Sequence, residues 1–354
     1  MIAGVRWMHG LLRARQLAGR AFARDSAFDV PSHDWHAAIW CDAANALGFA
    51  TRDLGYGVHE FVGNGRTTRT LGQLAMLNDP VTVRISGNKP LVYRLLEAES
   101  IPPPPHVAFT LDSFPSAVRF LESQAEPCVV KPAHGSAGGA GVTTGVHDRR
   151  ALMRAAAQAA LWSHELLIER QIPGTHYRLL FLDGEMLDAV RRPLPCVIGD
   201  GRSTVADLIK AENERRARVL HRYSLKPLAI DLECKCALRA KGLSLRDIPR
   251  IGERVIVRQV SNMGNEHDSE SVRDVIGRAL IADCARGVHA VGGRLAGVDV
   301  ITRDPTVGLA AGHGAIVDIN ATPGLFYHYQ VCNREKAVDV AIPILRALLE
   351  LSRP

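Results

Sequence analysis

Apolar and polar positions alternate along this chain with two periods, which divide it into short strands and amphipathic helices. Strands are expected at 81–85, 165–171, 177–181, 186–190, 254–259, 295–301 and 314–319, with a strand–turn–strand at 127–142. Helices are expected at 35–47, 86–100, 112–123, 149–162, 204–218, 271–291 and 338–351. Segment 55–69 lacks either period and is expected to be a loop. The pattern predicts a mixed α+β (α/β) fold.

Proline and turn residues indicate how these elements are grouped. The prolines 102–105 stiffen one connection and mark a boundary. Between 106 and 171 the order strand, helix, strand describes a compact α+β unit of its own. Asp183-Gly184 is a hairpin-type turn between the strands 177–181 and 186–190. A chain of 354 residues exceeds one typical core, so two or three packed units are expected, with boundaries near 85 and at 106–171.

Composition excludes several classes of protein. Hydrophobic residues make up 47% and charged residues 23%, as in an ordinary globular protein. Aromatic residues are few, at 5%, which argues against a base-stacking nucleic-acid surface, whereas the net charge of +6 decides little. No apolar stretch is long enough to span a bilayer, so no membrane partner is expected. The Arg-rich N-terminus favours a basic helix over a transit peptide.

The cysteines indicate a reducing compartment. There are 7 of them, scattered and without a C-x-x-C pair, which suits free thiols rather than disulfides or a zinc site. We therefore expect a cytoplasmic protein. The segment His33-Asp34-Trp35-His36 could bind a metal ion, but a helix cap with solvated side chains is the more common reason for such a pair.

Lysine and glycine meet at the end of one apolar strand. Lys131 closes the run Cys128-Val129-Val130, and the loop that follows contains Gly135, Ser136, Gly138, Gly139 and Gly141. Glycine lets backbone N–H groups turn toward an anion, and the ammonium group adds a point charge that reaches phosphate oxygens. The lysine precedes the glycines, so this is not the G-x-x-x-x-G-K-[ST] loop. The alternative is a glycine-rich hairpin with a surface lysine.

Oxygen ligands gather near the other end of the chain. Asp299 lies inside an apolar strand, and Asp318 and Asn320 lie two residues apart on the next one, so they point to the same face. Such hard oxygen donors suit Mg²⁺. The alternative for Asp318 and Asn320 is an Asx turn before Pro323-Gly324.

These motifs, in this order, resemble the ATP-grasp superfamily, most closely the ATP-grasp module of cyanophycin synthetases. The resemblance covers about residues 86–350. It is carried by these segments: Asn88-Lys89, Lys131 with its loop, Glu169-Arg170-Gln171-Ile172-Pro173-Gly174, 196–204, 241–245, 252–258, Asp299 and 318–328. It implies two α+β subdomains that grip ATP, with a lid at about 106–171, in an ATP-grasp domain at 86–354. A small pre-ATP-grasp region at 1–85 would precede it, and related folds often form homodimers.

The resemblance also implies roles. Such enzymes phosphorylate a carboxylate with ATP, and an amine then displaces the phosphate to form an amide. Lys89 and Lys131 would hold the phosphates under the glycine loop, Glu169, Arg170 and Ile172 the adenine, and His176 the ribose. Asp299, Asp318 and Asn320 would bind Mg²⁺ or Mn²⁺. Arg178, Arg192 and Arg258 would hold the acyl phosphate, unless they form structural ion pairs, and N–H groups near Gly324 would meet the oxyanion.

Three departures from the family pattern stand out. Asp318 replaces the more usual glutamate, His176 stands where an acid usually meets the ribose, and 263–269 replaces a Ser/Thr-Gly-Gly stretch. The Mur-ligase-like domain of cyanophycin synthetases does not follow, so synthesis of that polymer by this chain alone is not expected.

The sequence therefore favours an ADP-forming carboxylate–amine ligase that acts on an amino acid, small peptide or similar metabolite. An ATP-binding regulatory protein without turnover is the alternative, and an enzyme that makes an acyl phosphate or thioester is a third reading.

Overall fold

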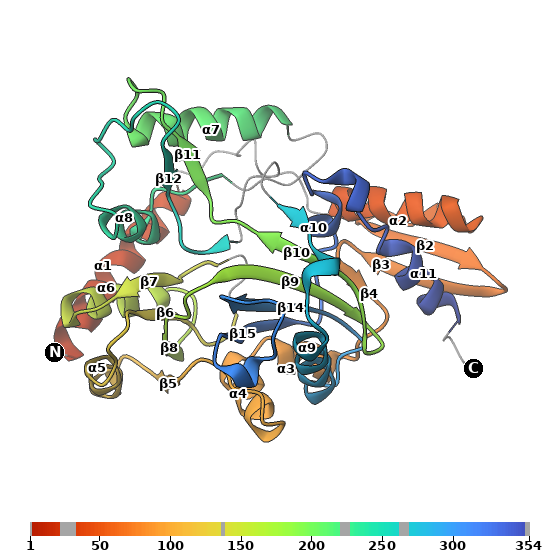
Figure 1. The fold of residues 1–354 in the computed structure, drawn as a ribbon, viewed down its shortest axis with the longest axis horizontal. Coiled ribbons are helices and arrows are strands. Elements are labelled where there is room, and N and C mark those ends of the chain that lie inside the picture. The colour runs from red at the N-terminus through yellow and green to blue at the C-terminus, as the bar shows by residue number, and fades with distance from the viewer. Residues whose placement is uncertain (1, 22–32, 136–138, 220–226, 262–268, 351–354) are drawn as a thin grey trace.

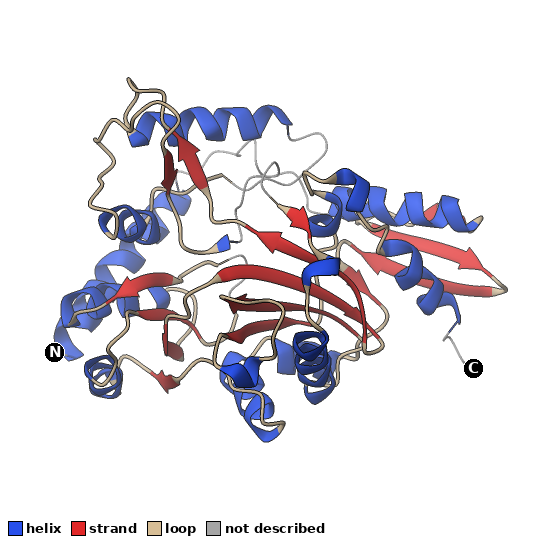
Figure 2. Cartoon of the chain, in the orientation of Figure 1, coloured by secondary structure: helices blue, strands red, loops and turns tan. Residues whose placement is uncertain are grey.

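The computed structural model describes residues 2–21, 33–135, 139–219, 227–261 and 269–350. Figure 1 shows its strands gathered into separate antiparallel sheets with helices packed around them, and Figure 2 shows the same view by type of element. The mixed fold predicted from the sequence is confirmed. The sequence predictions for Ser136, Gly138 and most of 263–269 concern residues outside the described ranges.

One four-stranded sheet forms the unit expected at 106–171. Its order is β5 (His106–Phe109), β8 (Leu166–Arg170), β6 (Cys128–Pro132) and β7 (Thr143–Val146). Helices α5 (Phe114–Glu122) and α6 (Arg149–Ala159) bury its apolar face. The N-terminal helix α1 (Ile2–Ala21) packs on the same core through the fully buried Val5. This region lies at the left of Figure 1 and has a core of its own.

A five-stranded sheet forms the centre of the molecule. Its order is β13 (Glu270–Ser271), β10 (Glu185–Arg192), β9 (Thr175–Leu182), β14 (Leu295–Thr302) and β15 (Gly314–Asn320). Helices α3 (Pro80–Ser86), α4 (Lys89–Ala98) and α9 (Arg278–Ala290) lie along one face (Figure 1). Val92, Leu96 and Leu280 pack there against strand residues such as Val298 and Ile319. Burying this face supplies the main hydrophobic stabilisation of the sheet and leaves its opposite face to carry polar groups.

A third sheet lies at the other end of the molecule. It comprises β1 (Ala50–Asp53), β2 (Val58–Gly63), β3 (Arg66–Leu71) and β4 (Leu74–Ala75), with α2 (His33–Leu47) and α11 (Ala341–Glu350) beside it. Trp40 and Phe61 pack here with Ile344 and Leu345. Residues from the start and the end of the chain therefore share one core.

An insertion follows β10 at the top of Figure 1. It comprises β11 (Cys196–Ile198), α7 (Val205–Val219), α8 (Leu232–Arg239) and β12 (Arg254–Ile256). The short elements of the chain are η3 (Arg273–Val275), η4 (Leu309–Ala311), α10 (Phe326–Tyr329) and η5 (Arg334–Lys336). Glu233 of α8 accepts hydrogen bonds from Thr144, on its backbone N–H at 2.7 Å and its hydroxyl at 2.9 Å, and so joins the insertion to β7.

Two predictions about the N-terminal segment are wrong. Segment 81–85 is helical, because Asp79 caps α3 by accepting from Val81 N–H and Thr82 N–H, and Pro80 fits the first turn. The helix cap at Asp79 and the proline at position 80 therefore decided the structure, although the apolar residues alternate as in a strand. Segment 55–69 is largely the β2–β3 hairpin rather than a loop. Its Asn64-Gly65 turn has φ values of 53° and 73°, a hairpin signal that the sequence did contain.

The helix expected at 271–291 is shorter than predicted. Ser271 instead pairs with Val190 of β10, and α9 begins only after Gly277. A Cβ on Gly277 would lie 1.9 Å from Thr306 O, so the chain approaches a neighbouring loop closely there. The two strands that carry Asp299 and Asp318 form as predicted.

Truncating Trp40 tests the shared core at the end of the chain. Trp40 is fully buried, and its indole N–H donates to Gly72 O at 3.0 Å. We expect Trp40→Ala to lower the free energy of unfolding by about 3–5 kcal/mol, because it leaves a large cavity. Trp7→Ala is the matched control, since Trp7 is 68% exposed, and should change stability by less than about 0.5 kcal/mol. Urea unfolding measures both; equal effects would contradict the packing described.

Candidate active site

Lys131 lies in a buried network at the end of β6. Its Nζ donates to Glu169 Oε1 at 2.7 Å and to the Tyr93 hydroxyl at 3.0 Å. The Tyr93 hydroxyl lies 2.8 Å from Glu169 Oε2, to which it donates. Burial lowers the pKa of Lys131, and the Glu169 carboxylate opposes that shift. An ammonium group this deeply buried is stable only with such partners, so the network fixes a positive charge at the strand end.

Lys89 brings a second ammonium group to the same place. Lys89 is the first residue of α4, where Asn88 caps the helix by accepting from Leu91 N–H. The backbone N–H of Lys89 donates to Ala133 O at 3.0 Å. Its Nζ lies 2.9 Å from Asp318 Oδ1. Burial alone would raise the pKa of Asp318, but the ammonium of Lys89 prevails and holds that pKa below its usual value.

Strand register explains how Asp299 gains its partners. Asp299 lies directly opposite Asp318 on β15 and opposite Arg178 on β9. Arg178 Nε lies 2.7 Å from Asp299 Oδ1, and Arg178 Nη2 donates to Oδ2 at 3.0 Å. Arg192, on β10, approaches Oδ1 at 3.4 Å. Directly opposite residues on antiparallel strands are close neighbours, so one row across the sheet gathers Asp318, Asp299 and Arg178. Arg192 lies two residues along β10 from that row and reaches Asp299 with its side chain.

The two sheets meet at a bulge in β15. Between Asp299 and Val300 the register skips Val317, whose carbonyl oxygen lies 3.0 Å from the Tyr93 hydroxyl and 3.5 Å from Lys131 Nζ. Asp318 follows at once. Lys131 from one sheet therefore lies beside the strand of the other sheet that carries Asp318.

Three known proteins can be compared with this chain. It is 28% identical over 277 residues to cyanophycin synthetase of Trichormus variabilis, covering 78% of this chain and 30% of that protein. It is 29% identical over 278 residues to the glutathione biosynthesis bifunctional protein GshAB of Streptococcus mutans, covering 76% and 35%. A crystal structure of a bifunctional glutathione synthetase from Pasteurella multocida superposes with a TM-score of 0.53 at 21% identity, covering 86% and 43%.

The chain has the ATP-grasp fold. The resemblance to ATP-grasp ligases is confirmed. No family model matches the chain. The chain spans about a third of the length of the curated relatives, 30% and 35% in the two named.

The glycine loop of this ATP-grasp chain is described in part. Gly135, Gly139 and Gly141 have φ values of 71°, 75° and 75°, which only glycine adopts without strain. A Cβ on Gly141 would also lie 2.7 Å from Trp162 Cδ1. The backbone conformation therefore requires glycine at these three positions.

The other residues predicted to bind nucleotide lie along β8 and β9. Arg170 is exposed at the end of β8, where its backbone N–H donates to Pro105 O at 2.9 Å, and Ile172 is half-buried after it. His176 Nδ1 lies 3.1 Å from Ser261 Oγ. Arg170 and His176 lie in the strands on either side of the connection 171–174, which joins the two sheets that carry Lys131 and Asp299, and Ile172 lies within it.

The remaining predicted residues lie in different surroundings. Arg258 is paired with Asp231 of the insertion, at 2.8 Å and 2.9 Å to its two oxygens. Asn320 lies opposite Gly297 on β14. A Cβ on Gly324 would lie 2.7 Å from Phe326 Cε1, so a side chain there would require the Phe326 ring to move.

Three residues of the site were not singled out from the sequence. Tyr93 lies one helical turn after Lys89, on the same face of α4. Tyr327 stacks over Arg192, with 4.1 Å from Cζ to the ring centroid. Gly297 lets Arg178 cross β14, since a Cβ there would lie 2.3 Å from Arg178 Nη1. Gly297 could have been noticed in the sequence as a glycine inside an apolar strand. Nothing in the sequence pointed to the two tyrosines.

The pKa of His176 gives a pH-dependent stability. Burial, and then the nearby Arg192, lower that pKa from 6.5 to about 4. Between pH 4 and 6.5 the unfolded chain therefore binds more protons, so stability is complete above 6.5 and falls as the pH decreases toward 4, by up to about 3 kcal/mol. His176→Asn should flatten this part of the curve in urea unfolding, whereas the exposed His147→Asn should keep it. An unchanged slope in His176→Asn would contradict the assignment.

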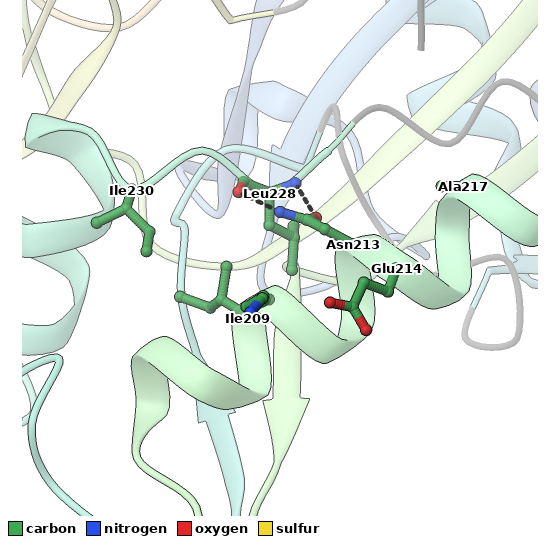
Figure 3. Close-up of a pocket in the computed structure, with 7 residues that line it drawn as sticks. Ile209, Asn213, Glu214, Ala217, Leu228 and Ile230 are labelled. Atoms are coloured by element: carbon green, nitrogen blue, oxygen red, sulfur yellow. Dashed lines mark hydrogen bonds between the residues drawn. The ribbon is translucent and has the colours of Figure 1, made fainter. Parts of the chain in front are cut away.

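A separate pocket lies in the insertion. Figure 3 shows Ile209, Asn213, Leu228 and Ile230 around it, with the Asn213 amide bonded to the Leu228 backbone at 2.7 Å and 3.0 Å. Its volume is about 300 Å³ and its lining is mostly apolar. None of the residues predicted to bind nucleotide or metal lines it. The charged row on the central sheet, and not this pocket, is the candidate active site.

No helix within the described ranges is long and apolar enough to cross a membrane.

Proposed function

We propose that this chain is an ATP-dependent carboxylate–amine ligase that forms an amide or peptide bond through an acyl phosphate and releases ADP and phosphate. The observation that carries the proposal is the convergence of Lys89 and Lys131 with Asp299 and Asp318 where two sheets meet. Because phosphoryl transfer depends on positioning and charge neutralisation, such a convergence of fixed charges is what the reaction needs.

The nucleotide would lie between the two sheets. Lys89 and Lys131 would hold its phosphates, and the loop 135–141 would cover them with backbone N–H groups. Glu169, Arg170 and Ile172 would line the adenine pocket, and His176 would meet the ribose. Glu169 already holds Lys131 at 2.7 Å, which supports a second role for it, the orientation of that ammonium.

Asp299, Asp318 and Asn320 would hold Mg²⁺ or Mn²⁺, whose role is to neutralise charge on the transferred phosphoryl group. Their side chains fit the ion, because all three offer hard oxygen donors: Asp299 and Asp318 lie opposite each other on adjacent strands, and Asn320 lies two residues beyond Asp318 on the same strand. No cluster of three or more His, Cys, Asp or Glu side chains able to hold a metal occurs in the described part of the chain. This agrees with an ion that takes its other ligands from phosphate oxygens and water.

The substrate carboxylate would meet the arginines. Arg178 and Arg192 present planar guanidinium groups that match carboxylate and phosphate oxygens, and both lie beside Asp299. Backbone N–H groups near Gly324 would stabilise the developing oxyanion. Arg258 binds Asp231 through Nη1, so a contact with the acyl phosphate would use its other guanidinium nitrogens.

Mass spectrometry of a reaction with ATP, Mg²⁺ and pooled amino acids and short peptides tests the proposal. The expected result is a new species whose mass equals one acid plus one amine less one water, with ADP formed in equal amount. The names of the relatives, cyanophycin synthetase and glutathione synthetase, motivate this choice of pool.

Two other outcomes would redirect the assignment. ATP binding with no ADP formation across the pool would favour a nucleotide-binding regulatory protein. An acyl phosphate trapped by hydroxylamine whose formation does not depend on any amine would favour a different ATP-grasp reaction.

A further inference from the structure

A buried aspartate–histidine pair lies near the two site arginines. Asp188 of β10 and His328 of α10 have no exposed surface, and His328 Nδ1 lies 2.7 Å from Asp188 Oδ2. The other carboxylate oxygen accepts from Ser271 Oγ at 2.8 Å. A carboxylate buried so completely is costly unless both oxygens are paired, and here both are.

His328 is held as a neutral imidazole. Burial lowers its pKa, and the positive charges of Arg178 and Arg192 add to that effect, while Asp188 opposes it. The Nδ1–H then donates to Asp188, which fixes the tautomer and the ring orientation. The other ring nitrogen, Nε2, has no hydrogen-bond partner among the described residues.

The pair fastens α10 to the strand that carries Arg192. Tyr327 precedes His328, and its ring centroid lies 4.1 Å from Arg192 Cζ and 5.7 Å from Arg178 Cζ. The chain beyond α10 is held as well, because Asn333 exchanges hydrogen bonds of 2.9 Å with the backbone of Ser271.

Arg192 is therefore constrained from two directions. In its plane it donates to Asp299 at 3.4 Å and to Ser261 O at 3.2 Å, while Tyr327 covers one face. A guanidinium group recognises a carboxylate or phosphate through two parallel donors, so its orientation decides how well it binds.

We propose that Asp188 and His328 are positioning residues that hold Tyr327 over Arg192 and thereby fix the guanidinium that receives the substrate carboxylate. This inference rests on the proposed ligase function. It gives α10 a role in the site, namely to hold the Tyr327 ring over Arg192.

Three variants separate positioning from simple stabilisation. His328→Ala removes the bond to Asp188, His328→Asn keeps a donor where Nδ1 stands, and Tyr327→Leu removes the ring while leaving the pair intact. For amide synthesis, we expect His328→Ala and Tyr327→Leu to raise KM for the carboxylate by about tenfold or more. KM for ATP should stay within about twofold, and His328→Asn should stay within about threefold of the wild type.

Three results would overturn the proposal: an unchanged carboxylate KM in Tyr327→Leu, an equal rise for ATP and carboxylate, or a His328→Asn variant as impaired as His328→Ala. If His328→Ala does not fold, Tyr327→Leu, at a half-buried position, provides the same comparison.

A wild-type protein that makes no amide would refute the ligase function but would leave the positioning claim testable. Crystal structures of the variants then decide. The Tyr327–Arg192 contact should be kept in His328→Asn and lost in His328→Ala, and a contact unchanged in His328→Ala would overturn the inference.

Discussion

Replacing Lys131 by methionine is expected to abolish ATP turnover, with a loss of at least about a thousandfold in kcat/KM, or about 4 kcal/mol of transition-state stabilisation. The Lys131 ammonium is buried and lies 3.5 Å from Val317 O at the bulge, so the variant removes a positive charge from the place where the phosphates would bind. Coupled assays of ADP formation and direct ATP binding measure the effect. Turnover within about tenfold of the wild type would rule out the phosphate role.

The same substitution also destabilises the fold, and this must be separated from catalysis. Without Lys131, the Glu169 carboxylate is buried with Tyr93 as its remaining hydrogen-bond donor in the network, which we expect to cost about 3–5 kcal/mol. The double variant Lys131→Met/Glu169→Gln removes both charges and should recover most of that stability. It should not recover turnover, because the phosphate contact is still missing.

The sequence predicted the strands that carry the candidate ion ligands, but not the packing that places them near Lys131. Strands 295–301 and 314–319 follow from apolar runs, and alternation places Asp318 and Asn320 on one face. Their distance from Lys131 does not follow from any local pattern. It depends on the pairing of β14 with β15 and on a bulge at Val317, both of which are set by tertiary packing.

Local signals that compete explain the wrong predictions of secondary structure. Segment 81–85 alternates like a strand, but the Asp79 cap and Pro80 start a helix whose buried face packs under the central sheet. Segment 55–69 lacks a clear period, but its Asn64-Gly65 turn alone would have predicted a hairpin. In both cases the cap or turn residues carried the correct signal, and periodicity did not.

Two of the predicted ion ligands, Asp299 and Asp318, and both predicted phosphate lysines have partners of opposite charge; that of Lys131 is Glu169. Lys89 neutralises Asp318, and two arginines neutralise Asp299. Binding of a metal–nucleotide complex would exchange these partners, since the ion would take over the carboxylates while the phosphates attract the freed cations. A site that keeps its charges paired in this way avoids the cost of leaving them buried and unpaired before the ligand binds.

Asp299→Asn tests this exchange and is the second variant with a large expected effect. It removes one ion ligand and leaves the buried Arg178 and Arg192 without their carboxylate. We expect kcat to fall by about a hundredfold to a thousandfold and the Mg²⁺ concentration for half-maximal rate to rise by about tenfold or more.

The dependence on the ion separates a metal ligand from a structural carboxylate. Mn²⁺ binds nitrogen and oxygen donors more tightly than Mg²⁺ and should restore part of the lost rate in Asp299→Asn. Asp183→Asn is the matched control, because Asp183 pairs with Arg294 at 2.7 Å on an exposed hairpin, away from the Asp299 row. It should leave both the rate and the metal dependence unchanged. If Asp299→Asn lost activity with the same Mg²⁺ requirement as the wild type, Asp299 would serve the arginines alone, and the ion would have to be held by Asp318 and Asn320.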